Sequence, residues 1–259
     1  MGRLRVAIGE QLKMCPRVIT LGVRSQMADY TVQERRLLRD ADIVFHPTNR
    51  FVDHLAVLDK ETFPSLDCYR LLGNRQKQVS LLRMLDIGYP RTRVYYGHKQ
   101  KQNILQDFTF PLIAKKVHNS VRGRSIFFID NEEKLKWYTN QYNPAFIQEY
   151  VPAKQVFLVV ILNYNRILGC WRKANNGNLE RKAIPPIHGE KDELRSKVVA
   201  SAIKIATGGH LSDLAVEIVF DGAEFWVSEI YFRYEERSEL HIRNERIEVI
   251  MEMIEQGVL

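Results

Sequence analysis

The sequence predicts an α+β fold with mixed sheets and long hairpins, rather than a series of regular βαβ repeats. Pairs of β-rich stretches are joined by short polar turns, which is typical of antiparallel hairpins. Stretches with helical periodicity fall between these hairpins instead of after every strand. The chain has 259 residues, of which 45% are apolar, enough to bury the core of one large domain or two small ones.

Roughly the first 70 residues predict a small α/β unit. The stretches "RVAIG", "PRVITLGV" and "ADIVFHP" have the composition of short buried strands, and Thr31 to Arg39 is a candidate helix between them. Strand, helix, strand is the order of such a unit. Further on, Asn49, Arg50 and His54 could line a pocket, and the start of a surface helix explains these three residues equally well.

The middle of the chain predicts a helix followed by four strands. Asn74 can cap the helix, Val79 and Leu82 belong to its apolar stripe, and Gly88 and Pro90 end it. The stretch "TRVYYG" is the first strand, "FPLIAKK" and "SIFFID" flank a polar loop that contains a glycine, and "AFIQEYVP" is the last strand. A short helix, "NEEKLKWYTNQY", precedes this last strand.

The remainder of the chain predicts two hairpins and two helices. The hairpin "QVFLVVILNYNRILGCWRKA" turns at Asn163 to Asn165, and the loop "NNGNLERKAIPPIHGEK" follows it. Asp192 to Thr207 is a helix with one apolar face. The second hairpin, Leu211 to Glu236, turns near Asp221-Gly222, and a helix near Glu239 to Glu255 completes the pattern.

Charge and cysteine content narrow the function classes. No stretch approaches the roughly 20 uninterrupted apolar residues of a membrane span, and the N-terminal stretch shows no secretory signal. Three widely spaced cysteines, Cys15, Cys68 and Cys170, exclude a complete disulfide framework and show no zinc spacing, so we expect a reducing, cytoplasmic location and no membrane partner. The net charge of +7 suits an anionic ligand such as a nucleotide, and a solvated basic surface explains it equally well.

The second hairpin carries one carboxylate in each of its apolar strands, Glu217 and Glu229. Loop length decides whether they share a face, because side chains alternate along a strand. A two-residue turn places them on opposite faces, whereas a three-residue turn at Asp221-Gly222-Ala223 places them on one face. The second arrangement collects most apolar residues on one face of the hairpin, and only Ser228 interrupts that face. We therefore predict that the two carboxylates share the other face. The apolar face would hold Leu214, Val216, Ile218, Phe220, Trp226, Ile230 and Phe232.

Two carboxylates a few ångströms apart repel each other unless a cation lies between them. Oxygen ligands of this kind suit Mg²⁺, which completes its octahedron with waters or phosphate oxygens. Glu217 and Glu229 are therefore candidate Mg²⁺ ligands, and a pair of surface glutamates on a half-exposed sheet is the alternative.

Five motifs occur in an order that is found in one family. They are the helix and turn "GNRQKQVSLLRMLDIGYPRT", the lysine strand and loop "LIAKKVHNSVRGRSIFF", the hinge strand "FIQEYVP", the pair "GCWRK" and "GNLERKA", and the carboxylate hairpin. In this order, the stretch from Lys60 to Tyr231 resembles the ATP-grasp superfamily, in particular its ribosomal-protein glutamate ligase-like (RimK-like) branch.

The resemblance implies an ATP-grasp fold with nucleotide between two α+β lobes. It implies a pre-ATP-grasp domain over residues 1–73 and an ATP-grasp domain over residues 74–259, with a lid at about 92–150 and a core lobe at about 151–259. The implied activity is an ATP- and Mg²⁺-dependent carboxylate–amine (or thiol) ligase that acts through an acyl phosphate. Its substrates would be small-molecule or peptide carboxylates and amines, and ligases of this family often form homodimers.

The resemblance also implies roles for individual residues. Glu217 and Glu229 would hold Mg²⁺ against the β- and γ-phosphates, and Arg172 and Arg181 would stabilise the acyl-phosphate transition state. The backbone of the hinge strand would read the adenine edge, and Gln155 would face the ribose. The residues that would bind ATP are Arg75, Lys115, Gly123, Ser125, Gln148, Glu149, Val151 and Gln155.

Three positions depart from the family pattern. Arg75 replaces a lysine that contacts phosphate, Gln155 replaces an acidic residue that holds the ribose, and Tyr231 replaces an asparagine beside the metal ligands. A phenol is a poor Mg²⁺ ligand compared with an amide carbonyl. The alternatives are a degenerate ATP-grasp protein that binds nucleotide without turnover, and a nucleic-acid-binding module suggested by "KKVHNSVRGR" and the net charge.

Overall fold

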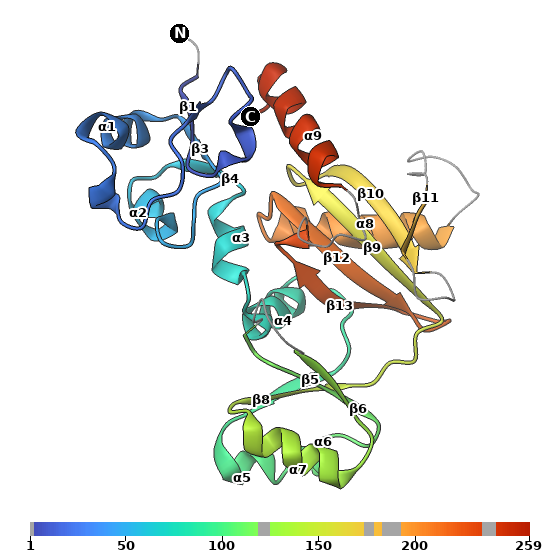
Figure 1. The fold of residues 1–259 in the computed structure, drawn as a ribbon. Helices are drawn as coiled ribbons and strands as arrows, with labels where there is room; N and C mark the ends of the chain where they lie inside the picture. The colour runs from blue at the N-terminus through green and yellow to red at the C-terminus, as the bar shows by residue number, and fades with distance from the viewer. Residues whose placement is uncertain (1–2, 119–124, 174–178, 183–192, 235–241) are drawn as a thin grey trace.

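The structure is a computed structural model that describes residues 3–118, 125–173, 179–182, 193–234 and 242–259, and the short segment 179–182 is described by its backbone alone. The described strands form three sheets (Figure 1). One is a parallel N-terminal sheet, and the other two, which we call the middle sheet and the large sheet, are antiparallel. The combination confirms the predicted α+β class.

The N-terminal sheet has four short strands, which pair in the order β2-β1-β3-β4: β1 (Arg5–Ala7), β2 (Ile19–Thr20), β3 (Ile43–Phe45) and β4 (Glu61–Phe63). Its helices are α1 (Val32–Asp40), α2 (Val52–Val57), α3 (Leu66–Leu71) and two single-turn 3₁₀ helices, Glu10–Leu12 and Met27–Asp29. The predicted helix α1 is present because Thr31 and Glu34 cap it reciprocally. Helix α2 agrees with the surface helix that the sequence offers as an alternative near His54. The sequence does not predict β4 or α3, because segments this short show no periodicity.

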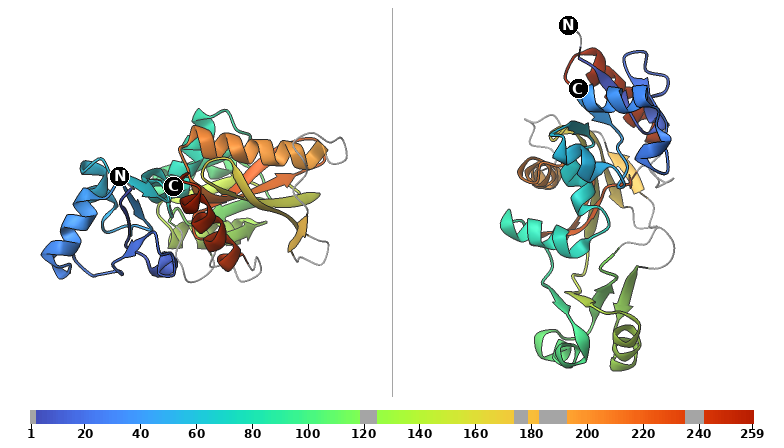
Figure 2. Two further views of the ribbon diagram at one scale, coloured as in Figure 1. Left: turned by 90° about the horizontal axis from the view of Figure 1, so that it is seen from above. Right: turned by 90° about the vertical axis from the view of Figure 1, so that its left-hand side faces the viewer.

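The middle sheet has β5 (Thr92–Tyr95), β6 (Leu112–Lys115), β7 (Ile126–Ile129) and β8 (Ala145–Glu149), in the order β5-β8-β6-β7. Its helices are α5 (Gly97–Lys101), α6 (Ile104–Asp107) and α7 (Glu132–Gln141). On one face, Ala114 and Ile147 form a core with residues of α6 and α7. Because side chains alternate along a strand, Lys115 and Gln148 lie on the opposite face. The middle sheet lies at the end of the molecule away from the N-terminal sheet (Figure 2).

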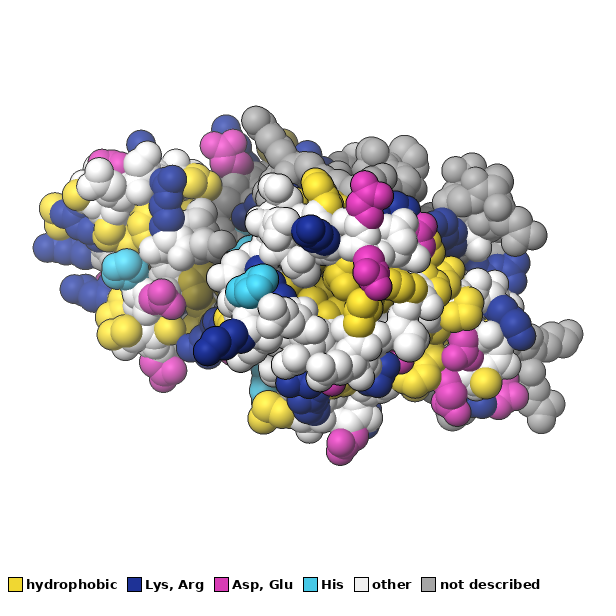
Figure 3. Space-filling view, turned by 90° about the horizontal axis from the view of Figure 1, so that it is seen from below, with side chains coloured by type: hydrophobic (Ala, Val, Ile, Leu, Met, Phe, Trp, Pro, Cys, Tyr) yellow, Lys and Arg dark blue, Asp and Glu magenta, His cyan; other side chains and the backbone are white. Residues whose placement is uncertain are grey.

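The outer surface of the middle-sheet unit has a groove of about 880 Å³ between α5, α6 and α7. Viewed from this end, hydrophobic side chains are surrounded by charged side chains of both signs (Figure 3). Leu105 and Leu135 line the groove. The groove is on the helix-covered side of the sheet, so it is separate from the face that carries Lys115.

The large sheet has the strand order β11-β10-β9-β12-β13, with β9 (Gln155–Leu162), β10 (Arg166–Lys173), β11 (Leu179–Lys182), β12 (Asp213–Phe220) and β13 (Phe225–Tyr231). Helix α8 (Glu193–Gly208) covers one face, where it packs against Val159 and Val216. On the other face, Leu158 and Ala215 share a core with α9 (Arg243–Glu255) and with the N-terminal sheet.

One strand of the large sheet is predicted as a loop, and helix α4 leads from α3 into the middle sheet. The segment around "GNLERKA" is predicted as a loop, but four of its residues form the edge strand β11 beside β10. An edge strand of one apolar and three charged residues has no alternating pattern that could reveal it. Helix α4 (Arg75–Met84) follows α3 and leads into the middle sheet, as Figure 1 shows.

The hairpin of β12 and β13 has a longer loop than predicted. Four residues, Asp221 to Glu224, join the strands instead of three, and Phe220 opposes Phe225. The predicted sorting is therefore wrong at the tip of the hairpin. Val227 packs on the α8 side together with Phe225, and alternation places Trp226 on the other side.

A β-bulge then restores the predicted facing of the two carboxylates. A regular ladder that continued from the four-residue loop would pair Glu217 with Ser228 and turn Glu229 to the α8 face. Instead the register shifts beside Glu217, so that Ser228 is the extra residue and Glu217 opposes Glu229 directly. The prediction that the carboxylates share a face is confirmed, and the register on which it was based is wrong.

Asp221 closes the loop of this hairpin. Its carboxylate accepts hydrogen bonds at 2.8 Å from the N–H groups of Ala223 and Glu224, and at 2.9 Å from Trp226 Nε1. These bonds, the backbone ones first, lower the pKa of Asp221 from 3.8 to about 2. Its contribution to stability is therefore complete above pH 3.8 and is lost as the pH falls toward 2.

We expect Asp221→Ala to lower the thermal midpoint at neutral pH, because three donors lose their acceptor. The difference between this variant and the wild type should shrink as the pH falls through the interval from 3.8 to 2. Asp221→Asn keeps one acceptor oxygen and should lie between them. Tryptophan-fluorescence melts at several pH values check this, and equal midpoints at neutral pH would contradict it.

The three cysteines are buried and free. Among the residues that the structure describes, no helix combines the length and hydropathy needed to cross a membrane.

Candidate functional site

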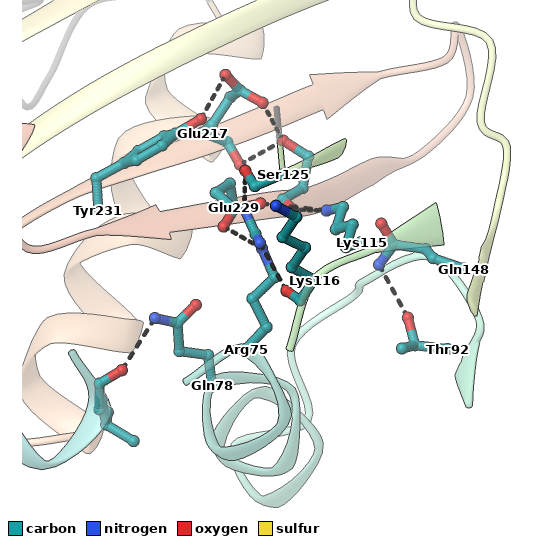
Figure 4. A network of polar contacts seen from close by, with 12 residues as sticks. Arg75, Gln78, Thr92, Lys115, Lys116, Ser125, Gln148, Glu217, Glu229 and Tyr231 are labelled. Carbon is teal, nitrogen blue, oxygen red and sulfur yellow. Dashed lines mark hydrogen bonds and ion pairs between the residues drawn. The ribbon is translucent and has the colours of Figure 1, made fainter. Parts of the chain in front are cut away.

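Three buried charged side chains meet where α4, β6 and β13 come together (Figure 4). Glu229 Oε1 accepts a hydrogen bond from Arg75 Nε at 2.7 Å, and Glu229 Oε2 lies 3.3 Å from Lys115 Nζ. The side chains of Arg75, Lys115 and Glu229 are only 5%, 6% and 2% exposed. We call these three residues the ion cluster. Charges are rarely buried to this extent unless they are paired, and here each charge has a partner.

Arg75 is held at the first turn of α4. Asn74 caps the helix by accepting a backbone hydrogen bond at 3.1 Å, and the Arg75 N–H donates to the Val117 carbonyl at 3.0 Å. The guanidinium donates from Nη1 to the Lys116 carbonyl at 2.8 Å and from Nη2 to Ser125 Oγ at 3.3 Å. Arg75 therefore joins α4 to the segments that follow β6 and precede β7, as well as to β13.

Lys115 is the last residue of β6, on the face away from the core of the middle sheet. In addition to its contact with Glu229, its Nζ donates to the Ser228 carbonyl at 2.7 Å. The Lys115 carbonyl accepts a hydrogen bond from Tyr138 Oη at 2.6 Å. Burial raises the pKa of Tyr138 to about 12, so the phenol remains protonated and keeps donating at neutral pH. This bond holds β6 at the residue that carries the ammonium group.

The second carboxylate, Glu217, lies directly opposite Glu229 in the ladder. It accepts hydrogen bonds from Ser228 Oγ at 2.5 Å and from Tyr231 Oη at 3.3 Å. Like charges directly opposite each other on neighbouring strands destabilise a sheet. Here both cations of the ion cluster contact Glu229, whereas Glu217 is held by two hydroxyl groups. The four side chains together carry two formal positive and two formal negative charges.

Little space remains around the ion cluster. A cavity of about 20 Å³ lies beside it, lined also by Gln78, Phe146 and Gln148. This volume holds about one water molecule, whereas small-molecule pockets measure about 300–1,000 Å³. The side chains themselves fill the site in this arrangement, so a larger ligand has to displace them.

The predicted hinge strand adjoins the ion cluster. Gln148 Nε2 donates to Thr92 Oγ1 at 2.8 Å, and Glu149 Oε1 accepts from the Arg91 N–H at 2.5 Å, so both side chains are tied to the segment that begins β5. No hydrogen bond joins the N–H of Val151 to another described residue. A ligand edge could therefore bind this backbone group.

Other predicted residues lie farther from the ion cluster or outside the described part of the chain. Gly123 belongs to a segment that is not described, and only the backbone of Arg181 is described. This backbone opposes Trp171, in a row that crosses the sheet to Glu217. Gln155 begins β9, where the chain leaves the hinge.

Strand alternation separates Arg172 from the two carboxylates. Arg172 opposes Phe157, which packs under α8, whereas Glu217 opposes Leu158, which packs on the opposite face. The structure therefore does not bring Arg172 to the carboxylates. The next residue, Lys173, is on their face by the same alternation.

The sequence did not predict two residues that help to form the site, in addition to Lys173. Ser228 makes the bulge and donates to Glu217, and its signal was the single interruption that it makes in the apolar side of the hairpin. Lys116 contributes a carbonyl oxygen to Arg75, and no sequence pattern reveals a backbone contact of this kind.

A family model of the RimK-like ATP-grasp domain matches residues 72–255, well over half of the chain. The chain belongs to the RimK-like ATP-grasp family. The matched range contains the ion cluster, the hinge strand and the carboxylate hairpin, so the resemblance inferred from motif order is confirmed. Members of the ATP-grasp family are ATP-dependent carboxylate–amine ligases.

Solved structures share the fold of this ATP-grasp chain at low sequence identity. A RimK domain ATP-grasp protein from Sphaerobacter thermophilus is 16% identical, with a TM-score of 0.65, and the match covers 92% of this chain and 94% of that one. A carboxyaminoimidazole ribonucleotide synthetase in complex with ADP is 15% identical, with a TM-score of 0.64, and the match covers 87% of this chain and 62% of that one.

Biotin carboxylase from Campylobacter jejuni, in a β,γ-ATP complex, is 17% identical, with a TM-score of 0.55, and the match covers 88% of this chain and 58% of that one. The chain thus spans less than two thirds of the length of the synthetase and of the carboxylase. A search among curated proteins found no match.

The carboxylates fit the magnesium ion that the family implies. Mg²⁺ at phosphoryl-transfer sites is bound by one or two carboxylates, with substrate phosphates and waters in the remaining positions. The part of the chain that the structure describes has no group of three or more His, Cys, Asp and Glu side chains placed to hold a metal ion. Glu217 and Glu229, which oppose each other in the ladder, would be the protein's ligands, beside cations that can bind phosphate.

Proposed function

We propose that this chain is an ATP-dependent ligase that joins a carboxylic acid to an amine or a thiol through an acyl phosphate. One observation carries the proposal. Two buried cations and two strand carboxylates form a neutral group between the middle sheet and the large sheet. This group contains the charges needed to bind a nucleotide together with Mg²⁺. It lies beside the hinge strand, after which the N–H of Val151 makes no hydrogen bond to another described residue.

The charges of the group match those of Mg²⁺–ATP. Arg75 and Lys115 would bind the α- and β-phosphates, and Glu217 and Glu229 would hold Mg²⁺. Every buried charge would then keep a partner. Arg75 offers phosphate a planar fork of N–H donors, whereas the lysine usual in the family offers a point charge. Nucleotide without Mg²⁺ would leave the buried carboxylate of Glu229 unpaired. We therefore expect nucleotide and Mg²⁺ to bind cooperatively.

The proposed reaction has two steps. A carboxylate oxygen of the acid attacks the γ-phosphorus, the bond from this phosphorus to the bridging oxygen breaks, and ADP leaves. The amine nitrogen (or thiol sulfur) then attacks the acyl carbon, phosphate leaves with the bonding electrons, and the amine or thiol loses its proton. Bound Mg²⁺ would neutralise charge on the phosphates.

The chain's own residues would orient ATP for these steps. Arg75 and Lys115 would fix the polyphosphate, because donors that are already in place need no reorganisation during reaction. The backbone from Glu149 to Val151 would bind the adenine edge, and Gln155 would bind the ribose. Residues 92–150 would act as the lid of the nucleotide site, and residues 1–73 would form the pre-ATP-grasp domain.

Lys173 and Arg181 are the cations we propose for the acyl-phosphate step. Lys173 shares the face of Glu217 by alternation, and the backbone of Arg181 is in the row of the sheet that leads to Glu217. Arg172, on the α8 face, is not part of this proposal.

ADP release tests the proposed function. The protein is incubated with ATP, Mg²⁺ and pools of carboxylic acids and amines, and ADP should form only when an acid and its acceptor are present together. Lys115→Met should lower the rate by about 100- to 1,000-fold, as the loss of a donor to a charged transition state does. Lys134→Met, at an exposed lysine of α7, is the matched control and should keep the rate. No ADP from any mixture would contradict the ligase.

Tyr231 favours a second candidate, a protein that binds nucleotide without turnover. Its hydroxyl donates to Glu217, at the position where the family has an asparagine. This contact occupies one oxygen of a metal ligand and supplies no amide oxygen in its place. If this second candidate is correct, the wild-type protein binds ADP but does not consume ATP.

We expect Tyr231→Asn to lower the Mg²⁺ concentration that half-saturates nucleotide binding by about ten-fold, because an amide oxygen replaces a competing phenol. Tyr231→Phe frees the Glu217 oxygen without adding a ligand and should give a smaller change. Thermal shifts with ADP across a Mg²⁺ series measure both. Turnover in Tyr231→Asn alone would establish the second candidate, whereas turnover in the wild type would exclude it.

A further inference from the structure

A second cavity, of about 360 Å³, lies between the N-terminal sheet and the large sheet. β1, β3 and β4 are parallel strands, so their carboxyl ends meet at one edge of the N-terminal sheet, where open α/β sheets bind ligands. Residues that follow these three strands form one wall. The opposite wall comes from α3, α9, the start of β12 and the segment after β13. The cavity has the size of a small-molecule pocket.

Two side chains in the first wall have buried polar atoms that lack a hydrogen-bond partner among the described residues. They are His46 Nε2 and Thr48 Oγ1, and His46 as a whole is 6% exposed. Buried polar atoms in native proteins almost always have a partner. A ligand in the cavity that offers a donor and an acceptor would satisfy both.

The backbone holds His46 in an unusual conformation. Its φ of 46° lies in the left-handed region, which residues other than glycine rarely adopt and which is frequent at functional sites. Gly9, at the end of β1, also lines the cavity. A Cβ atom at Gly9 would lie 2.8 Å from the Cβ of His46, so the two strand ends approach this closely only because residue 9 has no side chain.

The charges around the cavity favour an anion. Arg246 forms a buried ion pair with Asp213, which also accepts from Tyr234 Oη at 2.5 Å, so this carboxylate is already neutralised. Burial first, and then Arg246, lower the pKa of His46 well below its usual value, so its imidazole is neutral. Arg233 is exposed at the wall, and no ion pair joins it to another described residue. Among the described residues, its positive charge therefore has no counter-charge.

We propose that this cavity binds the acid substrate of the ligase, a small organic anion whose charge pairs with Arg233 and whose hydrogen-bonding groups reach His46 and Thr48. The inference rests on the proposed function. Arg233 follows Glu229 by four residues, so at most about 14 Å of chain separates them. An acid bound there is within reach of the carboxylate hairpin.

Only one of the three residues that the sequence suggested for a pocket in this region lines the cavity, and it is Asn49. Arg50 donates to the Ser25 carbonyl at 3.2 Å, and His54 is exposed on α2. The signal for the cavity was instead the position of His46 directly after a buried parallel strand.

Binding measured without nucleotide tests this inference separately from the ligase. Succinate, L-glutamate, citrate and benzoate are titrated by calorimetry, each beside its neutral amide, and inorganic phosphate is included. At least one acid should bind while its amide does not. Arg233→Gln should weaken the binding about ten- to hundred-fold, the usual worth of a hydrogen bond to a charged group. Arg243→Gln, at an exposed arginine outside the cavity, is the matched control and should change nothing.

Two further variants locate the ligand. His46→Asn keeps a residue type that tolerates the left-handed backbone, and Thr48→Val keeps the shape of its side chain. Each variant should weaken binding of the same acid several-fold, and its thermal midpoint should show that the protein is still folded. The inference is overturned if no acid binds, if only inorganic phosphate binds, or if the two arginine variants behave alike. ADP formation whose KM for the acid is unchanged by Arg233→Gln would leave the ligase standing and remove this site.

Discussion

Replacing Glu229 by glutamine should make the protein bind ADP more tightly without Mg²⁺ and less tightly with it. Under the proposed function, phosphate would have to compete in the wild type with Glu229 for Arg75 and Lys115, which contact the two oxygens of Glu229 at 2.7 Å and 3.3 Å. The amide would release both cations for phosphate and would remove a proposed Mg²⁺ ligand at the same time. Hydrogen bonds between charged groups are worth about 1.5–3 kcal/mol, so we expect ten- to hundred-fold tighter binding in EDTA. The increase in ADP affinity that Mg²⁺ produces should fall by a similar factor.

Calorimetric titration of ADP with EDTA and with Mg²⁺ measures both effects. Glu224→Gln makes the same chemical change on the same hairpin, at an exposed residue whose side chain is outside the ion cluster, and should match the wild type in both conditions. If Glu229→Gln binds ADP no better than the wild type in EDTA, the carboxylate does not compete with phosphate, and the proposed exchange of partners is wrong.

Arg75→Met should lower the free energy of unfolding by about 3–5 kcal/mol, the usual effect of breaking a buried ion pair by removing one partner. The variant leaves Glu229 with one cation instead of two and frees the Lys116 carbonyl and Ser125 Oγ. Arg93→Met removes a pair with Asp107 whose side chains are 60% and 32% exposed. That change should cost only about 0–1 kcal/mol.

A double variant shows whether the loss comes from the pair. Arg75→Met combined with Glu229→Gln should cost less than the sum of the single changes, because the second change no longer breaks an existing contact. Coupling between residues in contact is typically about 0.5–3 kcal/mol. Urea unfolding of the four proteins in the cycle gives this number. Strict additivity would mean that Arg75 stabilises the fold by other contacts.

The carboxylate hairpin shows what a single sequence can predict and where the prediction ends. The apolar pattern required one buried face, and this was enough to place Glu217 and Glu229 together. The register could not be predicted in the same way, because a four-residue loop with a bulge and a three-residue loop without one give the same facing. Only the strand pairing distinguishes them, and Ser228 is the residue that makes the difference.

The ion cluster shows a second limit. Motif order brought Arg75, Lys115 and Glu229 into one predicted site, but it assigned the first two to phosphate and the third to a metal. Their contact with each other depends on how α4, β6 and β13 meet, and 154 positions separate Arg75 from Glu229 in the chain. Pairing across such a distance is a property of packing and not of a local pattern. Alternation likewise replaced Arg172 by Lys173 once the register of β10 was known.

The oxygen atoms of the acid test the proposed reaction most directly. An acid substrate with ¹⁸O in its carboxylate is supplied with ATP, Mg²⁺ and its acceptor, and the phosphate released is analysed by mass spectrometry. An acyl phosphate transfers one carboxylate oxygen to phosphorus, so we predict one ¹⁸O atom in phosphate for each ADP formed. Phosphate without the label would mean that water attacks ATP directly, and this result would contradict the acyl-phosphate ligase.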